Sequence, residues 1–528
     1  MRSAKKKILL LVLLIFTGCL SSPQKETVLR VNFAFEPSTL DPRKGGDITS
    51  STLQFMLYEG LVRYAKDPLE RLGIAEKIDI SKDGRIYTFH LRESKWSDGH
   101  PVTAFDFEYA YRSMMNPHFL CPNANLLYPI LNARLVKEGK FPVENLGVIA
   151  KDEHTLVIQL SHPIPYFLDL LSFCVFAPVP KHLAETQTHW ANPKESALIS
   201  NGPFILAKWD PQGSLLLKKN PHYWQKEAIH IDSILATLIS DENTTLQMFQ
   251  KGELDILGVP FSPFPVDAAK ELMKEDKLSI RPAAGTSFLS FNLEKPFFQN
   301  WHIRQALSLA IDRGALTQNI TQLGEEPATG LTPPNLKRAS QATFPFPFDP
   351  EKARFHLYKG LEELGLKLNE IPPMRYLFNL NGPHEKIALA IQDAWREHLG
   401  IEVSLNGVEQ KTYLDRLSLK DFDVSQSYLL AQFSDQMNIL DRFKYKDNPK
   451  NHPGWSHHTY ESLLDQSLYL NGEDRDAILS EAEALLIKET AVSPLYHWSS
   501  CSVVNPKLQG LYLSEISSIH WQGVRFDK

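Results

Sequence analysis

The stretch "EKIALAIQDAWREHLGIEVSLNGV", residues 385–408, decides the fold class of this chain. Four of its apolar residues share one face at the spacing of an amphipathic helix: Ile387, Ile391, Trp395 and Leu399. Gly400 follows as a typical helix terminator, and "IEVSLNGV" after it is typical of a strand. The stretch therefore predicts a helix followed directly by a strand.

The same alternation continues on both sides of this stretch. Residues 300–313, "NWHIRQALSLAIDR", have helical periodicity, and Asp349 before Pro350 is typical of a capped helix start. Residues 422–433, "FDVSQSYLLAQF", predict another strand. Helices that alternate with strands predict an α/β fold with a mostly parallel sheet.

An earlier segment, residues 77–160, is rich in strand signals instead. Asp83-Gly84 is typical of a turn between two strands, and residues 149–161, "IAKDEHTLVIQLS", have the same hairpin pattern. Between the two hairpins we expect a helix that begins near Thr103, with Asp106 completing a capping pattern. The segment therefore predicts a β-rich unit beside the α/β part.

Length and charge narrow the class of protein. The chain has 528 residues, which favours two or three domains, and 43% of them are hydrophobic, as in ordinary globular proteins. The formal net charge is -6. Because a nucleic-acid binder needs a basic face to neutralise phosphates, we expect no nucleic-acid partner.

The N-terminus predicts export. A basic segment, "MRSAKKK", precedes the short apolar run "ILLLVLLIF" and then "TGC", which ends at Cys19. We interpret residues 1–18 as a signal peptide and residues 19–28 as a tether. A cysteine after a small residue resembles a bacterial lipobox, which implies lipid attachment to Cys19, although Phe16 departs from the usual Leu. The alternative is cleavage by the ordinary peptidase, with Cys19 incidental.

The remaining cysteines and the missing motifs bear on chemistry. Cys121, Cys174 and Cys501 allow at most one disulfide and one free thiol, and the sequence leaves the pairing open. The chain has no GxSxG, P-loop, GxGxxG or HExxH motif. We therefore expect no catalytic residue, no metal and no cofactor, and a binding protein rather than an enzyme.

Several phrases, taken together and in order, carry a resemblance to one family. They are "EPSTLDP" (36–42), "LYEGLVRY" (57–64), "YTFHLRESKWSDGHPVTAFDF" (87–107), "ISNGPFILAKW" (199–209), "LKKNPHYW" (217–224), "HIRQALSLAIDR" (302–313) and "GLTPP" (330–334). The sequence resembles the peptide-binding lipoproteins of ABC-type oligopeptide importers over nearly the whole mature chain.

The resemblance implies a bilobal α/β protein with the type II periplasmic-binding-protein fold and an additional β-rich subdomain in the first lobe. The expected boundaries are 29–55, 183–287 and 500–528 for lobe I, 56–182 for its inserted subdomain, and 288–499 for lobe II. Ligand lies between the lobes, which close over it by a hinge motion. The implied partners are an oligopeptide and the ABC permease subunits of the inner membrane, and we expect a monomer that is lipid-anchored to the membrane facing the periplasm or the cell exterior.

Three candidate binding residues match site positions of the family. Glu36 matches an acidic residue of the first lobe, and its alternative reading is a surface carboxylate at a strand end. His384 matches a site histidine of the second lobe, and the alternative interpretation is an ordinary polar residue at the start of a helix. Trp498 stands where the family places an aromatic residue at the cleft, and the alternative interpretation is an ordinary core aromatic residue.

The segment "QSYLLAQFSD", residues 426–435, aligns with the main peptide-holding segment of the family. Gln426 stands at an Arg position, Leu429 at a Trp and Gln432 at the Asp that pairs with the ligand's α-ammonium, with Leu430 beside them. Gln410 falls on an upstream pocket Trp. A neutral amide compensates a desolvated ammonium poorly, so we expect a site that does not require a free α-amino group and accepts N-blocked or cell-wall peptides.

The sequence leaves open the source of the missing charge and the identity of the ligand. Asp435 is an alternative source of the missing charge. The resembled family also includes binders of nickel chelates, haem and oligosaccharides on the same fold. Two alternative functions of other classes are a tethered cell-wall hydrolase and a surface adhesin. A cluster of His and Cys residues that would favour metal or haem is missing from the sequence.

Overall fold

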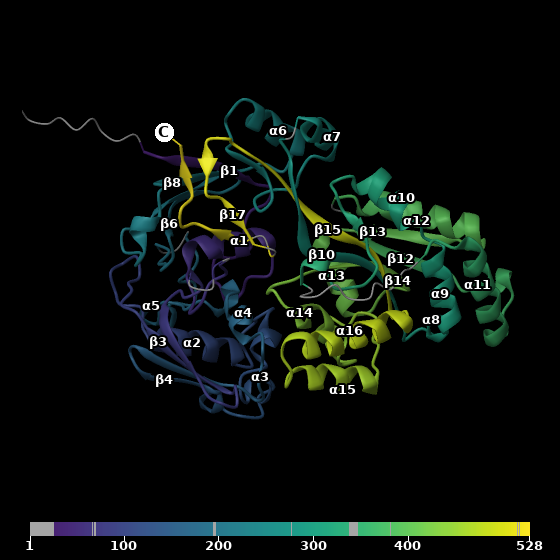
Figure 1. Cartoon of the computed structure of the whole chain (residues 1–528), viewed down its shortest axis with the longest axis horizontal. Coiled ribbons are helices and arrows are strands. Elements are labelled where there is room, and N and C mark those ends of the chain that lie inside the picture. The colour runs from purple at the N-terminus through teal and green to yellow at the C-terminus, as the bar shows by residue number, and fades with distance from the viewer. Residues whose placement is uncertain are drawn as a thin grey trace, which may run out of the picture.

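The computed structural model describes residues 26–65, 67, 70–193, 197–275, 277–336, 347–380, 382–514, 516 and 518–527. The predicted signal peptide, Cys19 and the tether up to residue 25 lie outside this part of the chain. The described residues form two lobes side by side, one with the N-terminal third of the chain and one with most of the C-terminal half (Figure 1). The C-terminal strands return to the first lobe (Figure 1).

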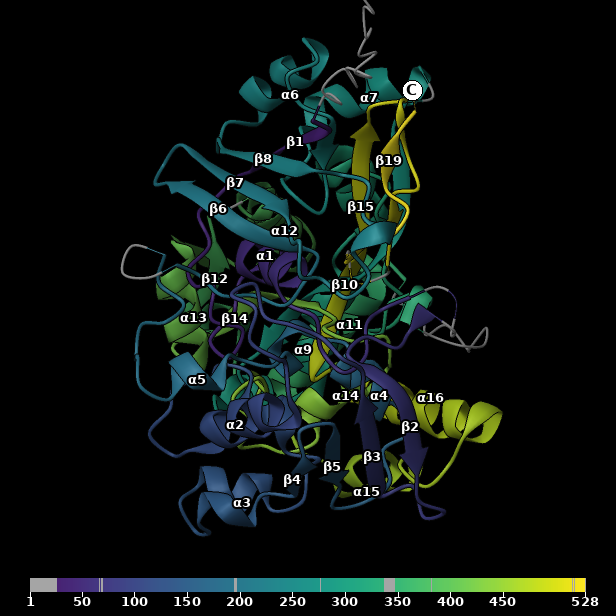
Figure 2. The ribbon, with the colours of Figure 1, turned by 90° about the vertical axis from the view of Figure 1, so that its left-hand side faces the viewer.

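The first lobe has two separate four-stranded sheets, which Figure 2 shows one above the other. One sheet has the order β1-β8-β7-β6, in which β1 and β8 are parallel and the other pairs antiparallel. Its strands are β1 (Val28–Phe33), β6 (Phe204–Asp210), β7 (Ser214–Lys219) and β8 (Ser233–Leu238). Helix α1 (Ile48–Leu57) contacts β6.

The other sheet of the first lobe is the β-rich unit that the sequence predicts. It is antiparallel, with the order β2-β3-β5-β4, and its strands are β2 (Ala75–Ile80), β3 (Ile86–Leu91), β4 (Val148–Asp152) and β5 (Thr155–Gln159). Gly84 in the first hairpin turn has a φ of 67°, which an Asp-Gly turn accommodates without strain. Both predicted hairpins are confirmed.

Short helices cover this unit. They are α2 (Ala104–Met115), α3 (Ala133–Lys137), α4 (Phe167–Leu171) and α5 (Lys181–Ala184). Helix α2 begins where the sequence predicts, because the Asp106 carboxylate accepts hydrogen bonds from the Thr103 backbone N–H at 2.8 Å and hydroxyl at 3.2 Å.

The second lobe has a seven-stranded sheet of order β11-β15-β10-β14-β12-β13, with β9 also paired to β15. Its strands are β9 (Ile256–Gly258), β10 (Ser279–Phe291), β11 (Glu326–Pro327), β12 (Met374–Asn379), β13 (Val403–Val408), β14 (Val424–Leu430) and β15 (Val492–Val504). Only the pairs β12–β13 and β12–β14 of the sheet as described are parallel, so the expectation of a mostly parallel sheet is wrong.

The reason for this mixed sheet lies in two long strands. β10 and β15 have 13 residues each and pair antiparallel, and Figure 1 shows them running from the first lobe into the second. The helix–strand units β12, β13 and β14 attach to one side of β10. The periodicity of the sequence predicts these units correctly, but it does not reveal that two crossing strands of opposite direction hold them.

The helices of the second lobe pack around this sheet (Figure 1). They are α8 (Pro296–Gln299), α9 (Trp301–Leu309), α10 (Arg313–Leu316), α11 (Pro350–Leu364), α12 (His384–Leu399), α13 (Gln410–Ser418), α14 (Met437–Leu440), α15 (His458–Ser467) and α16 (Gly472–Lys488). The predicted apolar face of α12 is buried, and Gly400 ends the helix with a φ of 68°. Helices α6 (Glu242–Gln250) and α7 (Val266–Lys274) lie near the first-lobe end of β15 (Figure 1).

Two large apolar clusters stabilise the fold. One extends through the first lobe and includes residues near α14–α16, such as Phe433 and Met437, and the other fills the α9, α11 and α12 side of the second lobe. The first cluster joins the lobes because its members come from both. Within the described ranges, no helix is long and apolar enough to cross a membrane.

Candidate functional site

Residues at the end of β14 contact the first lobe directly. The Gln432 Nε2 donates a hydrogen bond of 2.9 Å to the Asn123 Oδ1, and the Ser434 hydroxyl lies 3.5 Å from that of Tyr64. The rings of Phe433 and Tyr166 stack with centroids 5.3 Å apart and an interplanar angle of 7°. Three consecutive residues of the second lobe therefore bind the first lobe.

A cavity of about 480 Å³ lies beside these contacts. Its first-lobe wall includes Asn125, Tyr128, Arg134, His162 and Tyr166, and its second-lobe wall includes Gln432, Phe433, Asn438, Asp441, Arg442, Lys444 and Lys450. The volume is within the range of small-molecule and cofactor pockets, roughly 300–1,000 Å³. A cavity of this size with walls from both lobes can enclose a solute.

Gln426 lies inside the second lobe and holds His384 in place. The Gln426 side chain is 1% exposed, its Oε1 accepts from the Tyr376 hydroxyl at 3.2 Å, and its Nε2 lies 2.8 Å from the His384 Nδ1. Because the amide nitrogen can only donate, the His384 Nδ1 is the acceptor and the ring is neutral. Burial lowers the pKa of His384 to about 4, in agreement with this arrangement.

Tyr428 is the centre of an aromatic group on the same face of β14. Its ring stacks on His384 at 5.5 Å and on Tyr413 at 6.0 Å, and lies 5.8 Å from Trp498. The Tyr428 hydroxyl donates to the Gln410 Oε1 at 2.9 Å. The structure therefore brings four of the expected site residues into one network: His384, Gln410, Gln426 and Trp498.

Trp498 is held against the backbone of β10. Its Nε1 donates to the Ser287 hydroxyl at 2.8 Å, and its ring occupies the space where a side chain at Gly285 would lie. The register of β10 on β15 shifts between Pro282 and Thr286, the stretch that contains Gly285. Trp498 thus lies where the two long strands depart from regular pairing.

The other expected residues lie apart from this network. Leu429 is buried on the opposite face of β14 in the large apolar cluster, and Leu430 is half-buried, with its carbonyl accepting from Arg442 at 3.2 Å. Glu36 is exposed in the first lobe and accepts a hydrogen bond of 2.5 Å from the backbone N–H of Gln212.

Asp435 has a structural partner. Its two carboxylate oxygens bind the Arg475 guanidinium at 2.8 and 2.7 Å, both side chains are nearly fully buried, and one oxygen also accepts from the Met437 N–H at 2.9 Å. A carboxylate bound in this way has no free face for a ligand ammonium. The structure therefore disfavours Asp435 as the source of the charge that Gln432 lacks.

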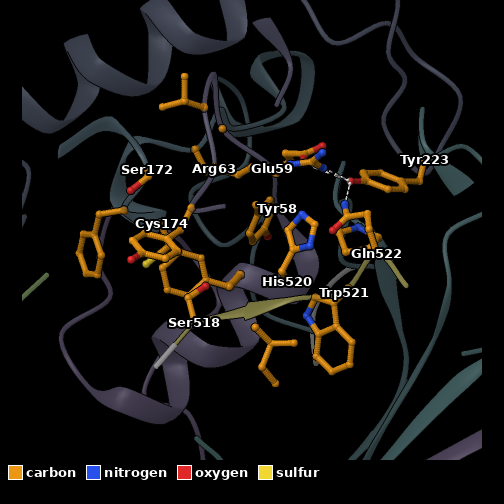
Figure 3. A pocket seen from close by; sticks show the side chains of 18 residues that line it. Tyr58, Glu59, Arg63, Ser172, Cys174, Tyr223, Ser518, His520, Trp521 and Gln522 are labelled. Atoms are coloured by element: carbon orange, nitrogen blue, oxygen red, sulfur yellow. Dashed lines mark hydrogen bonds and ion pairs between the residues drawn. The ribbon is translucent and has the colours of Figure 1, made fainter. Parts of the chain in front are cut away.

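A second, smaller pocket lies within the first lobe (Figure 3). It has about 50 Å³, room for a few water molecules, and the Gln522 amide donates to the Tyr223 hydroxyl at 2.9 Å beside it. Glu59, in its wall, is already bound by Arg63, Tyr223 and Trp224. The pocket is too small for a peptide, and its charged groups serve the fold.

Two further groups bear on metal and redox chemistry. Asp98, His100 and His182 lie at the surface of the first lobe with their ligand atoms within 4.8 Å of one another, which the sequence pattern did not reveal. Asp98 and His100 lie in one turn and His182 in a distant segment, and the Asp98 carboxylate lies 3.1 Å from the His100 ring and 2.8 Å from the His182 ring. Cys121, Cys174 and Cys501 are free thiols, which resolves the pairing that the sequence left open.

Several residues of the site escape prediction from the sequence. Alternation along β14 places Tyr428 on the face of Gln426, so that signal was available. Asn123, Tyr166 and Asp441 carried no signal, because only the approach of the lobes gives them their neighbours.

Comparison with known proteins agrees with this architecture. Residues 71–451 match the family described as bacterial extracellular solute-binding proteins, family 5. The oligopeptide-binding protein OppA of Bacillus subtilis is 33% identical over 506 residues, which cover 95% of this chain and 93% of that protein.

Solved structures match over nearly the whole chain. The murein tripeptide-binding protein MppA of Escherichia coli has a TM-score of 0.84 at 28% identity and covers 96% of this chain and 99% of its own, whereas the unliganded open form of MppA scores 0.72 over 95% and 98%. Haemophilus influenzae OppA in complex with RPPGFSPFR scores 0.83 at 26% identity over 96% and 100%. The lower score of the open form agrees with the contacts between the lobes.

The match confirms the bilobal α/β fold that the resemblance implies and the expectation of a binding protein rather than an enzyme. The description of the family as extracellular agrees with export. This chain therefore belongs to family 5 of the bacterial extracellular solute-binding proteins.

Proposed function

We propose that this protein captures oligopeptides between its lobes and delivers them to the permease of an ABC importer. The observation that carries the proposal is the cavity of about 480 Å³ at the end of β14, with walls from both lobes. A ligand that contacts both walls favours the closed arrangement of the lobes, which is the form a permease can distinguish from the empty one. The relatives named for oligopeptides, and the complex with RPPGFSPFR, support a peptide as the solute.

We further propose that the site accepts peptides without a free α-amino group. In support, Gln432 offers a neutral amide whose nitrogen already binds Asn123, and the nearby Asp435 carboxylate is bound by Arg475. A ligand ammonium at this position would lose its hydration without gaining a carboxylate. Peptides from the cell wall are candidates, since the similar protein MppA is described as binding a murein tripeptide.

We propose that eight residues bind the peptide, either directly or by positioning a residue that does. They are Glu36, His384, Gln410, Gln426, Leu429, Leu430, Gln432 and Trp498. Gln426 acts by orienting His384, and Gln410 by holding the Tyr428 hydroxyl. Leu429 lies below the site and supports the strand that carries it. We propose that lobe I comprises residues 29–55, 183–287 and 500–528, with its inserted subdomain at 56–182, and that lobe II comprises residues 288–499.

The N-terminal segment determines where the protein resides in the cell. We propose that the chain is a monomeric lipoprotein, anchored through Cys19 after removal of residues 1–18, and that it faces the periplasm or the cell exterior. The lipobox-like "TGC" and the extracellular family support this placement. A tether that keeps the protein at the membrane raises its effective concentration at the permease.

Native mass spectrometry of the purified protein tests the proposed function. We expect bound peptides of mixed sequence that leave on mild denaturation and rebind with one peptide per chain. Calorimetric titration with matched free and N-acetylated tetrapeptides tests the second part, and the two forms should bind within about threefold of one another. Purification without any peptide, together with no binding of a tetrapeptide library, would overturn the function. A large loss of affinity on acetylation would overturn only the second part.

A further inference from the structure

Two cations at the wall of the inter-lobe cavity, Arg442 and Lys450, have no carboxylate hydrogen-bonded to them among the described residues. The Arg442 guanidinium donates only to neutral acceptors, the Asn438 carbonyl at 3.0 Å and, at 3.2 Å each, the Leu430 carbonyl and the Asn438 side chain. In the part of the chain that the structure describes, the Lys450 ammonium has no hydrogen-bond partner. Both residues line the cavity and are half-buried.

The other charges around the cavity are mostly balanced. Lys444 binds Asp465 at 2.5 Å, and Arg134 binds Glu138 at 2.9 Å and Asp447 at 3.4 Å. Asp441 is the one remaining carboxylate among the lining residues described, and it has no hydrogen-bond partner there. Arg442 and Lys450 therefore have no carboxylate hydrogen-bonded to them in the described part of the chain, and Asp441 lies near enough to act on both electrostatically.

Burial, with a smaller effect of neighbouring charges, shifts the pKa values of the same groups. Burial lowers the pKa of Lys450 to about 7, an effect that Arg442 strengthens and Asp441 opposes. Burial also lowers the pKa of Arg442 to about 10, and it raises the pKa of Asp441. A ligand carboxylate that enters the cavity would stabilise the charged forms of Lys450 and Arg442.

We propose that Arg442 and Lys450 form a subsite that binds a carboxylate of an anionic peptide between the lobes. The inference deepens the proposed function and rests on it. The guanidinium is fixed beside the last carbonyl of β14, Leu430, so a peptide held by this strand would bring an acidic side chain or its terminus to the two cations. A carboxylate there makes charge-assisted hydrogen bonds to two cations that have no hydrogen-bonded carboxylate among the described residues.

This subsite and the neutral Gln432 together favour one kind of peptide. Asp441 is offset by the two cations beside it, and Gln432 is neutral. A peptide with a blocked amino group and one or more carboxylates matches this charge pattern, whereas a cationic peptide does not.

Binding of a carboxylate must couple to the protonation of Lys450. The groups that face this part of the cavity are Asp441, Arg442, Lys444, Tyr445 and Asp447 from the second lobe, and Tyr128, Arg134, Glu138, His162 and Tyr166 from the first. With a pKa of about 7, Lys450 is about half protonated at pH 7. A bound carboxylate raises that pKa, so the complex takes up about half a proton at pH 7.

Calorimetry with matched peptides tests the subsite. The probes are N-acetylated tetra-alanines in which one position is Glu or Gln, with the C-terminus free or amidated. At pH 6.5 we expect at least one replacement of a carboxylate by an amide to weaken binding to the wild type tenfold or more. In Lys450→Met the same replacement should cost less than threefold, and Lys450→Arg should restore the preference.

Lys446→Met is the matched control, because Lys446 is exposed on the same segment and does not line the cavity. It should behave as the wild type. Titrations in phosphate and Tris at pH 7 should show proton uptake in the wild type and none in Lys450→Met. Equal Glu-to-Gln ratios in the wild type and Lys450→Met, with peptides still bound, would overturn the subsite alone. No binding of any probe or library peptide would overturn the proposed function and this inference with it.

Discussion

Gln432 at the end of β14 donates a 2.9 Å hydrogen bond to Asn123 of the first lobe. The bond joins residues 309 positions apart and lies at the edge of the inter-lobe cavity. It also occupies the amide donor of Gln432, the residue that we propose for the position of the ligand's α-amino group. The Gln432 amide therefore contributes to the contact between the lobes, and in the proposed function it also sets the chemistry at the ligand's N-terminal position.

A carboxylate at this position should restore a preference for free amino groups. In Gln432→Asp, we expect tetrapeptides with a free α-ammonium to gain roughly tenfold to a hundredfold in affinity over their N-acetylated forms, because a charge-assisted hydrogen bond contributes about 1.5–3 kcal/mol. Titration calorimetry gives the ratio, and Gln466→Asp, at an exposed site on α15, should leave it unchanged. Equal gains for both peptide forms would contradict the assignment of this position.

The buried pair of Asp435 and Arg475 should be a large contributor to stability that single substitutions expose. Arg475→Met leaves the Asp435 carboxylate buried without its partner, so we expect a loss of about 3–5 kcal/mol in the free energy of unfolding by urea. Arg396→Met is the control, because Arg396 and its partner Asp393 are exposed, and it should change stability by less than about 1 kcal/mol. The double variant with Asp435→Asn should be more stable than Arg475→Met alone. A single variant as stable as the control would refute this account.

The neutral ring of His384 should make stability depend on pH in a defined window. Its pKa falls from an ordinary value of about 6.5 to about 4 in the folded protein, so its contribution is present above pH 6.5 and is lost as pH falls from 6.5 to 4. We expect His384→Gln to remove about 2 kcal/mol of this acid-induced loss. Urea unfolding across pH 4–8 measures it, and NMR of the ring reports the protonation directly. A ring that protonates near pH 6.5 would exclude the hydrogen bond from Gln426 as described.

Gly285 should tolerate no side chain. A Cβ there would lie 3.0 Å from the Trp498 ring and 3.1 Å from the Leu429 carbonyl. Gly285→Ala must push the Trp498 ring or the strand backbone by a few tenths of an ångström and strains the Trp498–Ser287 hydrogen bond, so we expect a loss of about 1–3 kcal/mol in stability and weaker peptide binding. At Gly46 the nearest atom to a Cβ is 3.9 Å away, and Gly46→Ala should be neutral in thermal unfolding. Neutral behaviour at both positions would show that Trp498 has room to move.

The anchor is open to a direct test in cells. In Cys19→Ser, lipid cannot attach, so we expect the protein to move from the membrane fraction to the soluble exported fraction. Mass spectrometry of the mature wild type should find its N-terminus at Cys19 with an added lipid mass. An unmodified N-terminus at another residue would support cleavage by the ordinary peptidase instead.

The sequence by itself determined the local elements and the family. The apolar faces of α12 and α9, the cap of α2 at Thr103 and the hairpin turn at Gly84 follow from spacing and from turn residues, because these interactions lie within a few residues of the chain. The ordered phrases predicted the two lobes and a solute between them. The net charge of -6 argued against a nucleic-acid partner, because binding to phosphates needs a basic face.

Only the tertiary structure decided which candidate residues work together. Alignment placed Gln426 at a ligand-binding position, but its burial shows that it holds His384, while Asp435 belongs to Arg475 from a helix about 40 residues later. The cavity comes from the approach of the two lobes, and the fold of the second lobe brings Asp441, Arg442 and Lys450 together on its wall. Long-range contacts of this kind depend on how the crossing strands β10 and β15 set the lobes against one another, and no local pattern in the sequence records that geometry.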